Sequence, residues 1–475
     1  MNTSAVEVSF REARRSDRRE DRGLLRAETG IFAAALLCSL GLLGFTVHRM
    51  WVWHGELGQQ HGSAWLFTAT AILLSAVGAF TAARLSVFVS LAFAAQWRSR
   101  RRRPYDQASC PYVSILVPCF NEGQTIESAL DSLLELDYPC YEVIAVDDGS
   151  TDDTLAKLQA FEGKFGHVTV RVFAKPNGGK WSALNHAFRR SVGELILCVD
   201  ADSRLAEDSL RRLMAHMEDP KVTAVAGQIR VRNRVNALTR LQAIEYHMGG
   251  GVRMGQGLLG TVLVVPGPEG LYRRSAMEEV FRRYGLRLQD GDPGAVSGPY
   301  EGDTFAEDFD LSLTILCLGG TIVYEPVAVS RTKAPEQTFA LISQRYRWIR
   351  GSFQVLRKLF ARAREAPALA RPRVLIWIGL TYVTDFAIAP VLYVLGFLLI
   401  LSTMAVAGPQ WLLLAWYLAF LLVQMSAGAL FLSINRDSFR LLPFCLLLDL
   451  YIGLLVNSAW AISVIDECRG RKMRW

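Results

Sequence analysis

The sequence lacks several features that would assign it to common protein classes. No two of its eight cysteines stand at Cys-x-x-Cys spacing, so the thiols of the central part are expected to be reduced and packed within a cytosolic domain. The Gly-x-Gly-x-x-Gly fingerprint of a dinucleotide site is also missing, because Pro118-Cys-Phe-Asn-Glu122 follows the first expected strand. This absence argues against a Rossmann dehydrogenase. The chain has no internal repeat and, apart from its basic arms, no low-complexity segment.

Apolar residues, by contrast, make up 51% of the chain, and the excess lies at its two ends. A basic arm precedes the first apolar stretch, which makes a signal peptide the alternative there. A second stretch follows at once and no clean small-residue cleavage site is present, and both facts favour a membrane helix. Each stretch is long enough to cross about 30 Å of hydrocarbon, so we expect five spans in an integral protein of the inner or plasma membrane. The stretches run over about 31–53, 64–95, 374–407, 410–434 and 441–465.

Lysine and arginine are distributed unevenly around the first two spans. They are dense in the segments 11–19 and 98–103, whereas the loop 53–62 between the spans contains none. Because such residues stay on the cytoplasmic side, the block after residue 103 is expected in the cytoplasm. These flanks account for the net charge of +7, are expected to contact anionic membrane lipids, and give no reason to expect nucleic acid. With five spans the basic tail 469–474 would lie outside, so either the number of spans is off by one or internal charges dominate.

The part between residues 111 and 333 alternates short β-rich runs with helical patterns. This alternation predicts an α/β domain with a doubly wound, mainly parallel sheet and helices on both faces. In such sheets ligands gather at the carboxyl ends of the strands, and Asp147-Asp148 and Asp200-Ala-Asp202 stand at strand ends here. The expected strands are 112–118, 141–146, 168–173, 195–199 and 222–231, and the expected helices are 125–136, 151–161, 181–190 and 208–217.

Asp200 and Asp202 stand one residue apart after an apolar run. At a strand end their carboxylates point roughly the same way and can share a divalent cation. Satisfied turns and helix caps use the same residue types, so the pair alone does not decide between these alternatives.

Other motifs accompany this pair in a fixed order. Val146-Asp-Asp-Gly-Ser-Thr-Asp152 lies upstream, and Ala306-Glu-Asp308 and Gln344-Arg-Tyr-Arg-Trp348 lie downstream. Together they resemble the D,D,D,QxxRW signature of membrane glycosyltransferases of family 2, which extend β-linked polysaccharides from nucleotide sugars. The resemblance covers roughly residues 110–360 and loosely the arrangement of spans. It implies a GT-A-like domain inserted between N- and C-terminal transmembrane helices.

The resemblance implies a donor site. Asp148 would contact a uracil ring. A carboxylate can accept a hydrogen bond from the imide N–H of uracil, and this favours UDP as the nucleotide. An ordinary strand-end turn is the alternative. Lys180 follows two glycines and would approach the phosphates, although such a loop is common by itself. Asp202 would ligate Mg²⁺ or Mn²⁺ directly, and Asp200 would face the nucleotide sugar.

The resemblance also implies the catalytic and acceptor residues. Asp308 would be the general base of a single displacement that inverts an α-linked donor into a β-linked product, and Glu307 would support the acceptor. Because Asp308 opens an expected helix, simple capping is the alternative. Gln344, Arg347 and Trp348 fall at i, i+3 and i+4 and share one helix face. The first two would hold the diphosphate and Trp348 would offer a flat face to a sugar ring, which is compatible with an amphipathic helix at the membrane.

Further segments narrow the resemblance to poly-N-acetylglucosamine, chitin-oligomer and hyaluronan synthases. Val323-Tyr-Glu-Pro-Val-Ala328 and Ala334-Pro-Glu-Gln-Thr338 are similar to the first, and the segment 265–274 is similar to the acceptor-end loop of the other two. No phosphate-gating segment and no cyclic-dinucleotide domain is found after Lys358, which argues against cellulose synthesis. The expected function is inverting transfer of a sugar from a UDP-sugar onto a growing polysaccharide, with UDP-N-acetylglucosamine as the expected donor. The polysaccharide is expected to move across the membrane, with accessory export subunits as candidate partners.

Two alternatives remain compatible with parts of this pattern. A non-processive transferase that puts one sugar on a lipid acceptor can carry the same motifs. A catalytically silent partner or transporter-like subunit is the other alternative, and the intact carboxylates at all three aspartate positions argue against it.

The expected organisation combines these parts. The stretch 286–302 looks like an insertion and is expected to be a surface loop rather than an acceptor contact. Asp385, Asp449 and Asn457 are candidates to line a polar channel, unless they lie near span ends in the headgroup region. The expected parts are a basic arm at 1–30, two transmembrane helices at 31–97, a cytoplasmic GT-A domain at 98–335, interfacial helices with the Gln-x-x-Arg-Trp motif at 336–372, and about three transmembrane helices with a basic tail at 373–475.

Overall fold

The structure is a computed structural model that describes residues 34–56, 59, 63–99, 105, 110–284, 295–362 and 370–471. The chain divides into two compact units. The first comprises the chain up to Ser86 together with Leu392–Leu446, and the second comprises Val87–Val391 together with the chain from Leu447 onward. All the motifs assigned above to donor, base and acceptor lie in the second unit.

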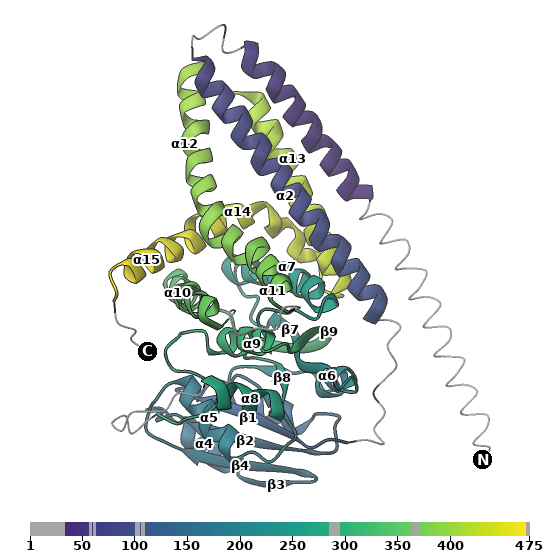
Figure 1. The fold of residues 1–475 in the computed structure, drawn as a ribbon, viewed down its shortest axis with the longest axis vertical. Helices are drawn as coiled ribbons and strands as arrows, with labels where there is room; N and C mark the ends of the chain where they lie inside the picture. The colour runs from purple at the N-terminus through teal and green to yellow at the C-terminus, as the bar shows by residue number, and fades with distance from the viewer. Residues whose placement is uncertain are drawn as a thin grey trace, which may run out of the picture. The chain divides into compact units, whose positions relative to one another are not determined.

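The second unit is built around a nine-stranded sheet with the order β3-β4-β2-β1-β5-β8-β7-β9-β6. Strand β1 pairs in parallel with β2 and β5, β2 with β4, and β7 with β9. Strand β8 is antiparallel to β5 and β7, and the edge strands β3 and β6 are antiparallel to their neighbours. This mixed, mainly parallel sheet confirms the predicted fold class (Figure 1). The strands are β1 (Val113–Cys119), β2 (Tyr141–Asp147), β3 (Gly163–Phe165), β4 (Val168–Ala174), β5 (Leu195–Cys198), β6 (Arg204–Leu205), β7 (Val222–Val231), β8 (Gly270–Arg273) and β9 (Thr321–Thr332).

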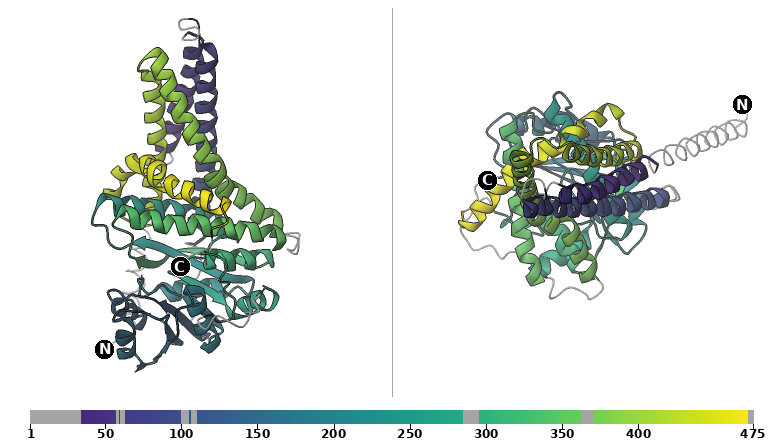
Figure 2. Two further views of the ribbon diagram at one scale, coloured as in Figure 1. Left: turned by 90° about the vertical axis from the view of Figure 1, so that its left-hand side faces the viewer. Right: turned by 90° about the horizontal axis from the view of Figure 1, so that it is seen from above.

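Helices alternate with these strands along the chain, as the sequence pattern predicts. The predicted helices are present, and their ends differ from the predicted ones by at most three residues. Figure 2 shows the helices of this unit beside the sheet from two further directions. The helices are α3 (Ile126–Leu134), α4 (Thr154–Ala160), α5 (Lys180–Arg190), α6 (Ser209–Met217), α7 (Ala237–Leu258), α8 (Arg274–Tyr284), α9 (Glu307–Cys317) and α10 (Thr338–Arg362).

The central strand β1 is buried on both faces, which explains why its sequence is almost continuously apolar. Its alternate residues Val113, Ile115 and Val117 belong to one core cluster that also contains residues of α3 and α6. Leu116 points to the opposite face, where α5 packs on β1 and β2. The sheet thus forms the middle layer between helices.

The parallel register brings the predicted site motifs to one edge of the sheet. Cys119 at the end of β1 pairs with Asp147 at the end of β2, and Leu116 pairs with Cys198 at the end of β5. Asp148 and Asp200 therefore leave the sheet at the same edge, where ligands bind in open α/β folds.

The segment 286–302 was expected to be a surface loop. Its described part, residues 295–302, instead packs against α5. Asn185 of α5 donates its amide N–H groups to the carbonyls of Val296 and Tyr300, each at 2.8 Å. The Tyr300 N–H returns a bond of 3.0 Å to the Asn185 carbonyl oxygen. A Cβ on Gly298 would lie 2.2 Å from that same oxygen, so this segment packs closely on α5. The reason is the buried Asn185 amide, which needs these backbone partners. Residues 286–294 of the predicted loop lie outside the described residues.

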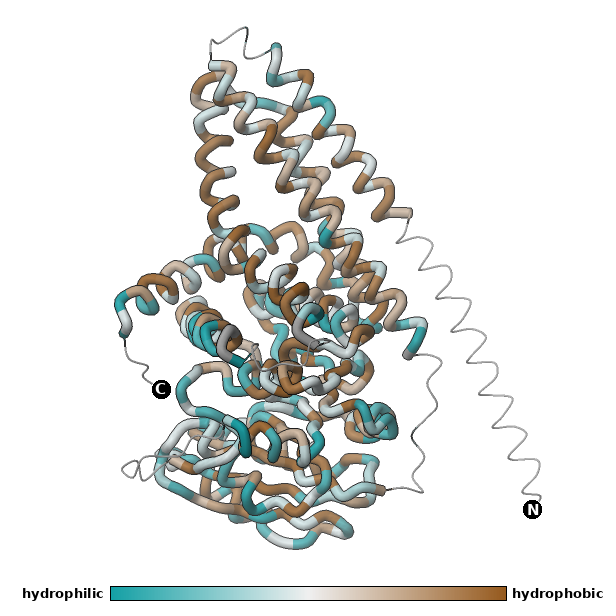
Figure 3. Tube along the Cα trace, viewed as in Figure 1, coloured by the Kyte–Doolittle hydropathy of each residue, from teal (hydrophilic) through white to brown (hydrophobic). Residues whose placement is uncertain are grey.

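The first unit is a helical bundle. Its core joins the helix Ala34–Glu56 with the first part of α2 (Ala64–Ser99), α12 (Ala389–Ala407) and α13 (Trp411–Ile434). Hydrophobic residues run along α2, α12 and α13 in Figure 3. Hydroxyl groups bond between helices inside the bundle: Thr70 and Thr403 are fully buried and their oxygens lie 3.0 Å apart. Such paired hydroxyls are the arrangement that an apolar surrounding demands.

Among the described residues, five helices are long and apolar enough to cross a membrane. The last of them is irregular, since Pro443 stands inside its first part and π-helical turns interrupt its second. They are Ala34–Glu56, Ala64–Arg98, Pro372–Ala407, Trp411–Ile434 and Phe439–Cys468. The third contains α11 (Ala370–Ile378), the π-helical η1 (Gly379–Ile388) and α12, and the fifth contains η2 (Phe439–Leu447), α14 (Leu448–Tyr451), η3 (Ile452–Val456) and α15 (Asn457–Cys468).

Candidate active site

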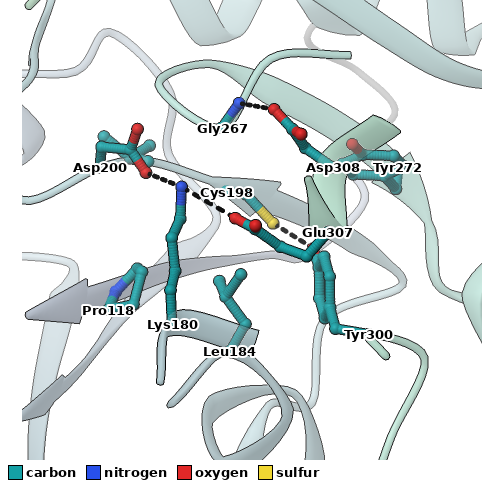
Figure 4. A pocket seen from close by; sticks show the side chains of 11 residues that line it. Pro118, Lys180, Leu184, Cys198, Asp200, Gly267, Tyr272, Tyr300, Glu307 and Asp308 are labelled. Atoms are coloured by element: carbon teal, nitrogen blue, oxygen red, sulfur yellow. Dashed lines mark hydrogen bonds and ion pairs between the residues drawn. The ribbon is translucent and has the colours of Figure 1, made fainter. Parts of the chain in front are cut away.

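Lys180 is the first residue of α5, and it is placed by the glycine before it. Gly179 caps the helix with a φ of +88°, a conformation that residues with a side chain rarely adopt. From there the Lys180 ammonium reaches two carboxylates, Asp200 Oδ1 at 2.7 Å and Glu307 Oε1 at 3.1 Å. Figure 4 shows the ammonium between these two groups. Residues more than 100 positions apart thus meet at one cation.

The charge of Lys180 is secured by these neighbours. Burial alone would lower the pKa of the ammonium, but the carboxylates of Asp200, Glu307 and Asp308 outweigh burial and raise the pKa well above its ordinary value. Lys180 is therefore a permanent positive charge at the pocket wall, which suits a site for a diphosphate.

Asp308 is in a different environment from its neighbour Glu307. Its carboxylate accepts backbone N–H groups, from Gly267 at 3.2 Å and from Phe309 at 2.7 Å. Burial and the adjacent charge of Glu307 raise the pKa of Asp308 to about 6, against the lowering effect of Lys180. The helix-capping alternative does not describe this residue, because Ala306 occupies the N-cap of α9 and no side chain caps the helix.

The loop between α7 and β8 completes this pocket through its backbone. A Cβ at Gly267 would lie 2.7 Å from Lys180 Nζ and 3.0 Å from Asp200 Oδ1, so a side chain at this position would have to displace the ion pair. Ser312 of α9 fixes the start of the loop, since its hydroxyl accepts the Val265 N–H at 3.0 Å. The remaining wall of the pocket is formed by Pro118, Leu184, Cys198, Val199, Tyr272 and Tyr300 (Figure 4).

Asp148 is buried and bonded to the glycine loop that precedes Lys180. Its carboxylate accepts N–H groups from Gly178 at 3.2 Å and Gly179 at 2.8 Å, and it is paired with the Lys175 ammonium. Burial raises the pKa of Asp148, although these donors oppose the effect. Asp148 therefore holds the glycine loop that precedes Lys180. Its contact with uracil remains a prediction.

The Asp202 carboxylate is bonded to hydroxyl groups. Both of its carboxylate oxygens accept the Thr332 hydroxyl at 3.1 Å, and Ser203 adds a bond of 2.9 Å. Burial and the nearby charge of Asp200 raise the pKa of Asp202. Burial also raises the pKa of Glu122, and the negative charges of Asp202 and Asp200 raise it further. Carboxylate oxygens are the ligands that a hard divalent cation such as Mg²⁺ or Mn²⁺ prefers.

A second acidic group in the structure is already paired with two cations. Carboxylate oxygens of Glu301, Asp303 and Asp310 lie within 4.8 Å of one another. Lys358 contacts all three, and Arg362 contacts Glu301 and Asp310. We refer to these five residues as the α9–α10 ion-pair cluster. Two cations already occupy this position, so the cluster joins two helices and is not a site for the predicted metal.

The Gln-x-x-Arg-Trp motif lies on α10, one turn or more inside the helix. The Trp348 side chain is 44% exposed, and the guanidinium of Arg345 lies 4.3 Å from its ring centre. Arg345 is itself buried and forms an ion pair of 2.6 Å with Glu245 of α7. Gln344 accepts an N–H of Arg345 at 2.7 Å. Arg347 and Trp348 are exposed and Gln344 is half-buried, and none of the three lines the pocket around Lys180.

The structure thus brings together Lys180, Asp200, Glu307 and Asp308 among the predicted site residues. Sequence reasoning placed Gly267 in the segment similar to an acceptor-end loop but did not predict its bond to Asp308, and it gave no role to Arg345, which packs on Trp348. The proline- and glycine-rich run around Gly267 was a signal of close backbone approach. No sequence signal distinguishes Arg345 from the other arginines of α10.

Comparison with known proteins finds glycosyltransferases similar to the central part of this chain. Residues 114–281 match the family model described as Glycosyl transferase family 2. A poly-beta-1,6-N-acetyl-D-glucosamine synthase of Staphylococcus epidermidis is 31% identical over 250 residues, which are 52% of this chain and 56% of the relative. An N-acetylglucosaminyltransferase of Neorhizobium galegae is 35% identical over 259 residues, which are 54% of this chain and 58% of the relative. The chain spans about half the length of the curated relatives it matches.

A solved structure supports the fold. The mannosyltransferase of Pyrobaculum calidifontis in complex with GDP-Man and Mn²⁺ is similar with a TM-score of 0.57 and 21% sequence identity, over 84% of this chain and 100% of that one. At that identity the likeness concerns the fold alone. The sheet has the order and mainly parallel pairing that the predicted fold class requires, and residues 114–281 within it are similar to a family 2 glycosyltransferase domain, as the order of the motifs predicts.

Proposed function

We propose that this protein is a membrane-embedded, inverting β-glycosyltransferase that extends a polysaccharide from a UDP-sugar, with UDP-N-acetylglucosamine as the donor. The observation that carries the proposal is the pocket in which Lys180 contacts Asp200 and Glu307 beside Asp308. It combines a fixed cation for a diphosphate with a carboxylate of raised pKa for a proton. The relatives named for N-acetylglucosamine transfer support the choice of sugar.

The proposed reaction is a single displacement at the anomeric carbon. Asp308 accepts the proton of the attacking acceptor hydroxyl, the hydroxyl oxygen bonds to the anomeric carbon, and the bond from that carbon to the phosphate oxygen breaks. Attack opposite to the leaving group turns an α-linked donor into a β-linked product. The glycine loop fixed by Asp148 would hold the nucleotide, and Lys180 would face the departing UDP.

The carboxylates after β5 fit the metal that such donors use. Asp202 would hold Mg²⁺ or Mn²⁺, with Asp200 directed to the nucleotide sugar, because their burial and mutual repulsion favour a bound cation. When bound, the cation would neutralise part of the diphosphate charge. Asp200 in turn orients Lys180 through its ion pair of 2.7 Å.

The acceptor side is proposed to lie along α10. Gln344 and Arg347 would approach the diphosphate, and the exposed Trp348 ring would stack on a sugar of the acceptor. We further propose that the catalytic unit faces the cytoplasm, as the basic segments around the first two spans predict. The growing chain would then cross the membrane, with lipids and export subunits as partners.

One experiment tests the proposed function directly. Membranes that contain the full chain are incubated with radiolabelled UDP-sugars, and the products are separated by size and by extraction into organic solvent. A labelled polymer from UDP-N-acetylglucosamine supports the proposal. An organic-soluble product with one sugar would identify the lipid glycosyltransferase instead, and no product with any donor would favour a silent subunit. The variant Asp308→Asn serves as the inactive control.

A further inference from the structure

The helix α15 lies along the catalytic helix α10 and is fixed to it by side-chain bonds. The Tyr346 hydroxyl donates to Asp466 at 2.9 Å, and Arg350 Nε donates to Glu467 at 2.8 Å. Ser463 donates to the Tyr346 carbonyl at 3.3 Å. These residues of α10 belong to the same turns as the Gln-x-x-Arg-Trp motif.

Glu467 is the centre of this contact. It accepts Gln354 at 3.2 Å and pairs with Arg357 at 2.8 Å in addition to Arg350. Positions 350, 354 and 357 fall on one face of α10, so three successive turns converge on a single carboxylate. The side chains of Arg350 and Glu467 are only 4% and 10% exposed. Loss of one partner of such a buried ion pair strongly destabilises a folded protein, because the other charge stays buried without compensation. The pair therefore holds the C-terminal end of α15 against α10.

The first half of α15 is fixed to the same part of the unit. Trp460 donates its indole N–H to the Phe386 carbonyl of η1 at 2.7 Å. In η1 the Tyr382 ring stacks on Phe309, the neighbour of Asp308, with ring centres 4.7 Å apart. Both halves of α15 therefore contact elements that stand next to the catalytic base.

The position of α10 itself is fixed by the α9–α10 ion-pair cluster. Lys358 pairs with Glu301 at 2.8 Å and with Asp310 at 3.0 Å, two residues after Asp308. The helix that α15 contacts is thus part of the catalytic unit. An α15 that ended on the opposite side of a bilayer could not make the bonds to Tyr346 and Arg350.

We propose that the segment 439–468, although long and apolar enough to span a membrane, does not cross it. It lies at the membrane surface on the side of the catalytic unit, and Glu467 acts as a positioning residue for the Gln-x-x-Arg-Trp face of α10. The preceding helices agree with this: α12 and α13 are joined by the short link 408–410, so a crossing pair returns the chain to the side from which it left. The chain then crosses four times, and the basic residues after Cys468 lie on the same side as the segment 98–103.

The side of α15 can be read without any enzymatic activity. Cys468 is exposed and serves as a natural reporter in a full-length variant that carries Cys38→Ser, Cys110→Ser and Cys140→Ser. A membrane-impermeant maleimide is applied to sealed right-side-out and inside-out vesicles. The remaining cysteines of the chain are buried and should not react.

Two matched variants calibrate the two sides. In each, Cys468→Ser is combined with one new cysteine: Lys164→Cys on the exposed strand β3 reports the catalytic side, and Gly55→Cys, at the end of the helix Ala34–Glu56, reports the side of the loop between the first two spans. A Cβ at Gly55 meets nothing within 4 Å. We expect Cys468 to react in the same vesicles as Lys164→Cys and not in those where Gly55→Cys reacts. Reaction together with Gly55→Cys would overturn the proposal. Protection of Cys468 in both vesicles would also overturn it, because its side chain is exposed in this arrangement.

The positioning role rests on the proposed function and has its own measurement. Glu467→Gln should lower sugar transfer per folded molecule roughly 10-fold to 10²-fold through displacement of α10, while the affinity for UDP stays near normal. The double variant Arg350→Glu/Glu467→Arg should recover part of the loss, and Glu162→Gln, an exposed carboxylate elsewhere in the unit, should change nothing. Normal transfer by Glu467→Gln, or a double variant no better than the single one, would reject the positioning role and leave the labelling result unaffected.

Discussion

Glu307 and Asp308 show how two adjacent carboxylates acquire different chemistry. Glu307 is paired with Lys180 at 3.1 Å, whereas Asp308 accepts backbone N–H groups and has its pKa raised to about 6. A carboxylate with this pKa is ionised at neutral pH and still basic enough to take a proton from a hydroxyl in the transition state. The separation of roles between the two residues follows from their partners and not from their residue type.

The raised pKa predicts a pH profile. Below about pH 6 Asp308 is protonated in the folded protein and cannot act as a base, so the rate of transfer should fall as the pH drops through this value and be constant above it. Initial rates with labelled donor between about pH 5 and pH 8 measure this limb. A profile that is flat down to the lower limit would contradict the assignment of Asp308 as the base.

Asp308→Asn separates the base from the donor site. The amide keeps the size of the side chain but cannot accept a proton, so turnover should fall by at least about 10²-fold while UDP affinity stays unchanged. Turnover is measured with labelled donor, and affinity by titration with UDP. Glu162→Gln, a substitution of an exposed carboxylate, is the control. The assignment is wrong if UDP affinity collapses while the rate per bound donor remains normal.

Asp202 belongs to the predicted metal site, and its loss should be visible in the metal response. Transfer should need Mg²⁺ or Mn²⁺, and Asp202→Ala should abolish both this response and donor turnover, because the remaining carboxylates cannot replace a direct ligand. The measurement is a titration of activity with each ion after treatment with chelator. Full activity of the wild type in excess chelator would refute the metal role.

At the scale of elements, the α9–α10 ion-pair cluster connects the helix of the base to the helix of the acceptor. Lys358→Met would leave Glu301 and Asp310 with only Arg362 as a partner. A buried charge without a partner destabilises the folded protein. We expect the free energy of unfolding to fall by an amount at the lower end of the roughly 3–5 kcal/mol found for broken buried pairs, since one cation remains. The loss is measured as a lower thermal midpoint in detergent. Lys164→Met on exposed β3 is the matched control, and an equal midpoint for both variants would show that the cluster contributes nothing to stability.

Elements were predictable where the sequence pattern is local. The predicted strand 222–231 agrees with β7 at both ends, and the parallel strands before it differ by one residue at most. Short antiparallel β8 was not predicted, because four residues carry no period and the strand is defined by its pairing with Leu195–Cys198. The packing of Tyr300 on Asn185 is likewise a tertiary contact without a local signal. The same holds for the five-residue cluster between α9 and α10.

The sequence predicts part of the candidate pocket but not its geometry. The ordered motifs identify Lys180, Asp200, Glu307 and Asp308, which line the pocket, whereas the other predicted site residues lie outside its lining. The carboxylates that pair with Lys180 come from the loop after β5 and from α9. Their distances to the ammonium are set by the strand register and by the packing of the loops. The backbone of Gly267 and the guanidinium of Arg345 contribute through tertiary contacts, which a single sequence does not specify.

At the scale of the whole molecule, a polymer-forming enzyme has to keep a polar chain bound between additions. UDP leaves after each transfer, so the acceptor has to be held by groups that let it slide by one sugar. An aromatic face meets this need, because it binds a sugar ring without fixing the direction of its hydroxyl groups. Trp348 is an exposed aromatic residue of the motif, and the Arg345 guanidinium packs over its ring.

Trp348→Ala should therefore shorten or abolish the polymer while UDP binding stays nearly intact. Arg345→Met should have a weaker effect in the same direction, because the ring remains but loses the guanidinium that lies 4.3 Å from its centre. Product length is measured by gel filtration of labelled polymer. Phe339→Ala is the control on the same helix, since Phe339 is 85% exposed and precedes the motif. Full-length product from Trp348→Ala would rule out this ring as the acceptor platform, and a wild type that releases only a single-sugar glycolipid would show that no processive step exists.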